Sequence, residues 1–177
     1  MHMDAEIVEI NCEKYKELYL LSKEILQEED KRNSYIEAKA GRYVTSLIIL
    51  FGGLGFFGKW VIKELFPICS IFETIITVLL IATAATIFFG VIIIYLILKQ
   101  KDYLVRNVDV EFFDKNDLPT VYRELAIENR NATKINRDVN NIKSKLLGKV
   151  HLLTLASMVM FLLLVTLFAI YSAIYIS

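Results

Sequence analysis

The chain alternates between charged segments and three long apolar blocks. These blocks cover residues 43–66, 74–98 and 152–177, and the second and third carry no charged side chain. A helix rises 1.5 Å per residue, so about 20 apolar residues cross a bilayer core roughly 30 Å thick. A helix in a soluble core usually keeps a polar side, whereas residues 152–177 are apolar on every face. The pattern therefore predicts an all-α integral membrane protein with three transmembrane helices.

The two charged segments predict how the chain is oriented. Residues 1–42 hold seven Lys/Arg and ten Asp/Glu, and residues 99–151 hold eleven and eight. Segments rich in Lys and Arg stay on the cytoplasmic side of a membrane. We therefore expect four parts: a cytoplasmic N-terminal helix (1–42), a transmembrane hairpin (43–98), a cytoplasmic connection (99–150) and a third span (151–177) that ends outside.

Two shorter elements are predicted in the charged segments. Residues 12–32 carry apolar side chains at helical spacing, which indicates an amphipathic helix; the apolar positions are Tyr15, Leu18, Leu21 (or Tyr19) and Ile25. Within residues 102–117, Val108, Val110 and Phe112 alternate with acidic residues. Alternation of this kind is typical of a short strand.

A long helix is predicted from residue 118 onward. Asp117 is a good N-cap, and Pro119 falls in the first turn, where proline is tolerated. Apolar residues then recur at steps of three and four, interrupted only at Glu128; they are Leu118, Val121, Leu125, Ala132, Ile135, Val139, Ile142 and Leu146. This row predicts a coiled-coil seam, on a helix that continues through Gly148 into the third span. Its partner is either the acidic N-terminal helix or the same helix of another subunit, and both contacts can coexist.

The stretch FGGLGFFGKW contains the glycine spacing of a dinucleotide-binding loop. That loop requires a short strand before it and a soluble helix after it, and apolar runs flank these glycines instead. We therefore predict no cofactor. Small residues mark helix contacts in membranes, so we expect packing within or between subunits at Gly52, Gly55 and Gly58 and at Ala82, Thr86 and Gly90. The alternative is that Gly is simply commoner in membrane helices.

Four basic residues form a candidate anion site on the predicted long helix. Arg123, Arg130 and Arg137 recur every seven residues, with Lys134 beside them. Guanidinium groups on one helix face can bind a nucleotide, an oligonucleotide or anionic lipid headgroups. The alternative is a solvated face, or a partner for acidic residues of the N-terminal segment.

The third span carries a stripe that is polar at its ends and apolar in the middle. Repeated around an oligomer axis, such a stripe can form a pore with a hydrophobic gate. Its residues are Thr154, Ser157, Phe161, Val165, Phe168 and Ser172. The alternative is a packing or lipid-facing stripe whose hydroxyls bond their own backbone.

Catalytic and metal-binding residues are scarce. The histidines are His2 and His151, and no Ser or Cys forms a motif with either. Cys12 and Cys69 are expected on opposite sides of the membrane, which excludes a disulfide between them. We therefore expect neither an enzyme nor a metal protein.

The layout resembles that of small membrane effectors of bacterial anti-phage systems. A charged helix runs through SYIEAKAGRY into a membrane hairpin and is followed by a polar helical segment, as in SLATT-type proteins and the channel subunit of the Hailong system. The third span departs from a plain two-span effector. The resemblance implies a homo-oligomeric, ion-conducting effector in the bacterial plasma membrane, gated by a nucleotide or oligonucleotide, with a nucleotidyltransferase as partner. The alternative is a non-conducting membrane anchor that recruits a partner through its coiled coil.

Overall fold

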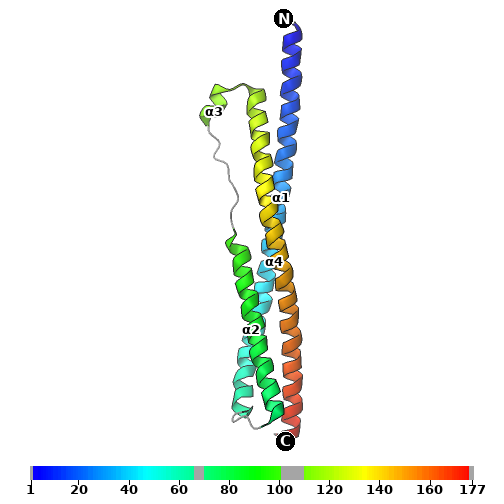
Figure 1. Ribbon diagram of the computed structural model, residues 1–177, viewed down its shortest axis with the longest axis vertical. Coiled ribbons are helices and arrows are strands. Elements are labelled where there is room, and N and C mark those ends of the chain that lie inside the picture. The colour runs from blue at the N-terminus through cyan, green and yellow to red at the C-terminus, as the bar shows by residue number, and fades with distance from the viewer. Residues whose placement is uncertain (1, 66–69, 101–109, 176–177) are drawn as a thin grey trace. The chain divides into compact units, whose positions relative to one another are not determined.

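The computed structural model describes residues 2–65, 70–100 and 110–175 of the 177-residue chain. Within these ranges every regular element is a helix, and there are no strands: α1 is His2–Leu65, α2 is Ile71–Lys99, α3 is Val110–Lys115 and α4 is Leu118–Tyr175 (Figure 1). The chain divides into two compact units. Unit 1 comprises Met1–Ile36 and Gln100–Ile142, and unit 2 comprises Glu37–Lys99 and Lys143–Ser177.

The ends of the long helices follow local sequence signals. α1 ends at Leu65, two residues before Pro67, because a residue that precedes proline is disfavoured in the helical region. α2 opens with a capping box. The backbone N–H of Glu73 donates to the Ser70 hydroxyl over 3.2 Å, and the Ser70 N–H donates to the Glu73 carboxylate over 2.9 Å.

The predicted start of α4 and its continuation through Gly148 are confirmed. The helix begins at Leu118, and the carbonyl of Asp117 accepts the first intrahelical hydrogen bond, from Val121 N–H over 3.0 Å. α4 then runs for 58 residues, through Gly148, to Tyr175. A single glycine costs a helix about 1 kcal/mol, which the rest of so long a helix can offset.

The predicted short strand is wrong where the structure describes it. Val110 and Phe112 belong to α3. The ammonium group of Lys115 lies 3.2 Å from the carboxylate of Glu111, an i,i+4 ion pair that favours a helical turn over a strand. Val108 lies outside the described residues.

Unit 2 contains three helical segments with a mainly apolar core, in which polar residues such as Thr83 and Ser157 are also buried, and a mainly apolar exterior. Its core is formed by side chains such as Leu47 of α1, Ile87 of α2 and Leu164 of α4. Its exterior is apolar as well, with Phe56 86% exposed. Among the described helices, α1, α2 and α4 are each long and apolar enough to cross a membrane. A bundle that exposes large apolar side chains all round suits lipid rather than water.

Specific polar and aromatic contacts join the three segments of unit 2. The hydroxyl oxygens of Ser157 in α4 and Thr86 in α2 lie 2.9 Å apart, and the Tyr171 hydroxyl donates to Glu73 over 2.8 Å. Between α1 and α4, the rings of Trp60 and Phe168 lie 4.6 Å apart between centroids in an edge-to-face arrangement, which is a favourable geometry for aromatic pairs.

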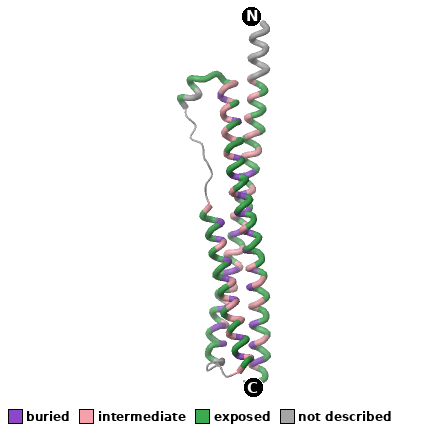
Figure 2. Tube along the Cα trace, viewed as in Figure 1, coloured by how far each residue is buried: buried purple, intermediate pink, exposed green. Residues whose placement is uncertain are grey.

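In unit 1, α1 and α4 run parallel. The numbers of the contacting residues rise together along both helices, from the Tyr19 and Tyr122 rings, 5.8 Å apart, to the Arg32–Asn141 hydrogen bond of 2.9 Å. Buried positions recur along each helix between exposed ones (Figure 2). This contact confirms that the acidic N-terminal helix docks on the predicted long helix.

The side of α4 that faces α1 differs from the predicted seam. In this part of α4 the buried residues are Val121, Ala126, Thr133, Asn136 and Asn140, and of these only Val121 belongs to the predicted seam. Ile135 and Ile142 of the predicted seam remain 38% and 50% exposed. α1 supplies hydrogen-bonding groups to this contact, and polar residues of α4 satisfy them, whereas an apolar row could not.

Candidate anion-binding groove

A groove of about 720 Å³ lies between α1 and α4 in unit 1. This volume falls within the usual range for a small-molecule site. The α1 wall is largely apolar and comprises Leu18, Leu21, Ser22 and Ile25. The prediction of an amphipathic helix over residues 12–32 placed three of these residues on an apolar stripe. The side chains of Leu18 and Leu21 remain about half exposed, so α4 does not cover that stripe completely.

The α4 wall combines small or apolar residues with charged ones. Ala126, Ile127 and Thr133 lie among five polar and charged residues, which are Arg130, Asn131, Lys134, Arg137 and Asp138. Three cationic side chains against one carboxylate give this wall a positive balance. A groove with one apolar wall and one cationic wall suits a ligand that carries both an anionic group and an apolar or planar part.

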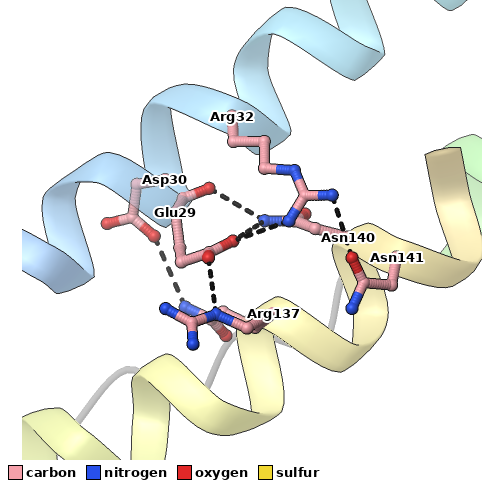
Figure 3. A network of polar contacts seen from close by, with 7 residues as sticks. Glu29, Asp30, Arg32, Arg137, Asn140 and Asn141 are labelled. Carbon is pink, nitrogen blue, oxygen red and sulfur yellow. Dashed lines mark hydrogen bonds and ion pairs between the residues drawn. The ribbon is translucent and has the colours of Figure 1, made fainter.

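A polar network holds the two helices together beside the groove (Figure 3). Its centre is Glu29 of α1, which is buried. The Glu29 carboxylate accepts hydrogen bonds from Nε of Arg137 over 3.0 Å and from the Asn140 amide over 3.1 Å. The same amide also donates to the Glu29 backbone carbonyl over 2.9 Å, and Asn136 donates to Asp30 over 3.4 Å.

The network shifts the pKa values of its two carboxylates in opposite directions. Burial by itself raises the pKa of Glu29, but hydrogen bonds from Asn140 and Arg137, together with the charges of Arg32 and Arg137, lower it below its ordinary value overall. Burial raises the pKa of Asp30. The ionised form of Glu29 is therefore stabilised, whereas burial destabilises the ionised form of Asp30.

Three of the four predicted polyanion-binding residues lie together. Arg130, Lys134 and Arg137 line the groove, whereas Arg123 lies outside it and is exposed. Arg137 takes part in both the groove and the network, since its side chain is 55% exposed although its Nε is bonded to Glu29. For Arg137, the alternative interpretation therefore holds, namely that a cation of this set pairs with an acidic residue of the N-terminal segment.

The predicted pore stripe lies largely within the packing of unit 2. Thr154, Ser157 and Phe168 are buried, Phe161 and Ser172 are half-buried, and Val165 is 37% exposed. The Thr154 and Ser157 hydroxyls donate to backbone carbonyls four residues earlier, over 2.9 and 2.8 Å. In a single chain, then, most of this stripe contacts helices of the same chain.

The predicted packing glycines differ in their surroundings. A Cβ atom added at Gly90 would lie 3.0 Å from Leu47 of α1, and one at Gly58 would lie 3.6 Å from Leu80 of α2. Nothing lies within 4 Å of a Cβ added at Gly52 or Gly55. Ala82 and Thr86 are half-buried. Contact with another subunit at Gly52 and Gly55 stays a prediction.

Several residues of the site were not singled out from the sequence. Glu29 and Asn140 had no visible signal, because each looks like one more polar residue of a charged helix. Gly53 was assigned no packing role, although a Cβ added there would lie 3.3 Å from the Phe161 ring. Within the described residues, no three His, Cys, Asp or Glu side chains are grouped to hold a metal ion.

No protein-family model matches this chain, and neither a curated protein nor a solved structure resembles it significantly.

Proposed function

We propose that this protein is a homo-oligomeric, ion-conducting membrane effector, and that an anionic nucleotide or oligonucleotide controls it by binding the α1–α4 groove. The observation that supports this function most directly is the gathering of Arg130, Lys134 and Arg137 on one wall of a groove whose other wall is apolar. Phosphate oxygens match the cationic wall, and a base or sugar matches Leu and Ile side chains.

The Lys/Arg distribution supports a cytoplasmic groove. Residues 99–151 hold eleven Lys/Arg and residues 1–42 hold seven, whereas the C-terminal apolar block has none. A cytoplasmic groove is accessible to nucleotides made inside the cell. The resemblance in layout to anti-phage effectors supports a bacterial plasma membrane and a nucleotidyltransferase as the source of the signal.

The double role of Arg137 suggests how a ligand would act on the helices. A phosphate that binds Arg137 competes with Glu29 for the same guanidinium group. Glu29 would then be a buried carboxylate with fewer hydrogen bonds, a state that is unfavourable unless α1 moves. Ligand binding would in this way weaken the α1–α4 contact.

Binding and conductance measurements on the same purified protein test this function. The probes are ATP and a short oligoadenylate, titrated by calorimetry and added to the protein in planar bilayers. We expect binding to the wild type, at least a tenfold loss of affinity in the Arg130→Gln/Lys134→Gln variant, and a conductance that the bound ligand changes. Arg123→Gln is the matched control, because Arg123 lies on the same helix outside the groove. Equal loss in the control, or no conductance under any condition, would contradict the proposal.

A non-conducting membrane anchor is the second candidate. It is favoured by the burial of Thr154, Ser157 and Phe168 against helices of their own chain, which leaves them no surface on a pore. In that case the coiled coil recruits a partner, and ligand binding changes that recruitment while the bilayer current stays at zero.

A further inference from the structure

The apolar row of α4 is not the surface that α1 covers. This row is defined here as Leu125, Ala132, Ile135, Val139 and Ile142. From Ala132 to Ile142 it keeps the spacing of three and four residues that is typical of a coiled-coil seam, and Glu128 occupies the seam position between Leu125 and Ala132. α1 instead contacts the polar side that carries Thr133, Asn136 and Asn140. At 100° per residue, the apolar row is centred about 100° around the helix from that contact, on the side away from the groove.

We propose that the apolar row is the contact between copies of this chain, with α4 of one copy packed in parallel and in register against α4 of the next. Ile142 is 50% exposed and Ile135 is 38% exposed. Leu125, Ala132 and Val139 are half-buried. A second helix that seats on the row would cover all five residues.

Anchoring in a membrane favours a second copy as the occupant of the row. α4 continues without a break from the row into a segment apolar enough to cross a membrane. A bilayer gives every copy the same direction and the same depth, so the rows of two copies meet in parallel and at equal height. A coiled coil of identical helices needs this arrangement.

From Ala132 to Ile142 the row is uncharged, which also fits a second copy. Glu128 is the one charged residue in line with the row, and the neighbouring Asp138 and Lys145 have opposite signs. The whole chain has a formal net charge of zero, so copies do not repel one another through net charge.

The residue types of the row indicate more than two copies. In heptad terms, Ala132 and Val139 occupy a positions, and Ile135 and Ile142 occupy d positions. β-branched residues at d disfavour a two-stranded coiled coil, whereas Leu at d favours one. The proposal therefore includes at least three chains. It rests on the membrane embedding within the proposed function, but neither on the ligand nor on ion conduction.

Disulfide trapping in native membranes tests the contact. Cys12 and Cys69 are first replaced by Ser, and a single cysteine is then placed at Ile135, Ile142 or Ser144. Ser144 is exposed and lies on the opposite face from the row, so it is the matched control. We expect mild oxidation to link copies through positions 135 and 142 at least fivefold more efficiently than through 144. Equal linking at all three positions would overturn the proposal.

The mass of the purified protein in detergent gives an independent readout. We expect the wild type to contain at least three chains and Ile142→Asn to become monomeric. Ile127→Asn is the control, because Ile127 is an exposed isoleucine of the same helix in the groove rather than in the row. A monomeric or dimeric wild type, or an unchanged mass in Ile142→Asn, would contradict the contact. An oligomer that carries no current in bilayers would contradict the proposed function alone.

Discussion

Arg137 of α4 donates a hydrogen bond from Nε to Oε1 of Glu29 in α1 over 3.0 Å. The acceptor is buried and the donor is half exposed, so one guanidinium group satisfies a carboxylate of the helix contact and also lines the groove. Any anion that binds in the groove therefore meets a residue on which the contact between the two helices depends.

Removing the guanidinium group of Arg137 should weaken the contact between α1 and α4. In Arg137→Gln, Glu29 loses an ionic hydrogen bond and stays buried, which we expect to cost the α1–α4 contact about 1–2 kcal/mol, because the solvent already screens the half-exposed guanidinium. Hydrogen exchange of residues 12–36 in the detergent-solubilised protein measures this change. Adding Glu29→Gln should recover part of the loss, and Arg123→Gln should change nothing. A double variant that exchanges faster than Arg137→Gln would contradict the pairing.

The helix contact should weaken in acid because of Glu29. The pKa of Glu29 in the folded protein lies below its ordinary value of 4.5. The stability that it contributes is therefore complete above about pH 4.5 and is lost as the pH falls toward the lowered pKa. The raised pKa of Asp30 acts in the opposite direction, because protonation relieves its burial cost. Spin labels at positions 23 and 123 report the separation of the helices between pH 7 and pH 3. We expect the distribution of this distance to broaden less on acidification in Glu29→Gln than in the wild type. Equal broadening in both proteins would exclude Glu29 as the cause.

The sequence was sufficient to predict the long helices but not which of their faces meet. Periodicity and the N-cap residue Asp117 located α4, and the uncharged blocks located the apolar segments. The pattern could not choose between two adjacent rows of α4, because the choice depends on Glu29 and Arg32, more than 100 residues away in the sequence. Those residues favour Asn140 and Asn141 as hydrogen-bonding partners over Ile142.

The candidate site was predictable only in part, for a related reason. The seven-residue spacing between Arg130 and Arg137 predicted the cationic wall directly. The opposite wall is formed by Leu18 and Leu21, which the sequence identified as the apolar side of a helix without a partner. Arg123 is excluded from the groove by the position at which α1 and α4 meet. The spacing of residues along one helix gives no information about that position.

Gly90 should be less tolerant of substitution than Gly55. A Cβ at Gly90 would lie 3.0 Å from Cδ1 of Leu47, so Gly90→Val must displace a buried leucine. Overpacking of this kind costs about 1–3 kcal/mol, whereas Gly55→Val meets nothing within 4 Å in the same chain. Thermal unfolding in detergent should show a lower midpoint for Gly90→Val only. A loss of oligomer mass in Gly55→Val would support the contact between copies that the sequence predicts there.

Tyr171 should stabilise unit 2 through its hydroxyl. This group donates to Oε1 of Glu73 over 2.8 Å, and the other oxygen of the same carboxylate accepts the Ser70 backbone N–H in the capping box of α2. Tyr171→Phe keeps the ring, which stacks on Phe72 at 6.1 Å, and removes the hydroxyl together with its buried hydrogen bond to Glu73. We expect a loss of about 1 kcal/mol in unfolding free energy, measured by thermal unfolding in detergent. Tyr95→Phe is the matched control, because Tyr95 is 61% exposed on α2. Equal destabilisation by both substitutions would show that the hydroxyl of Tyr171 has no special role in joining α4 to α2.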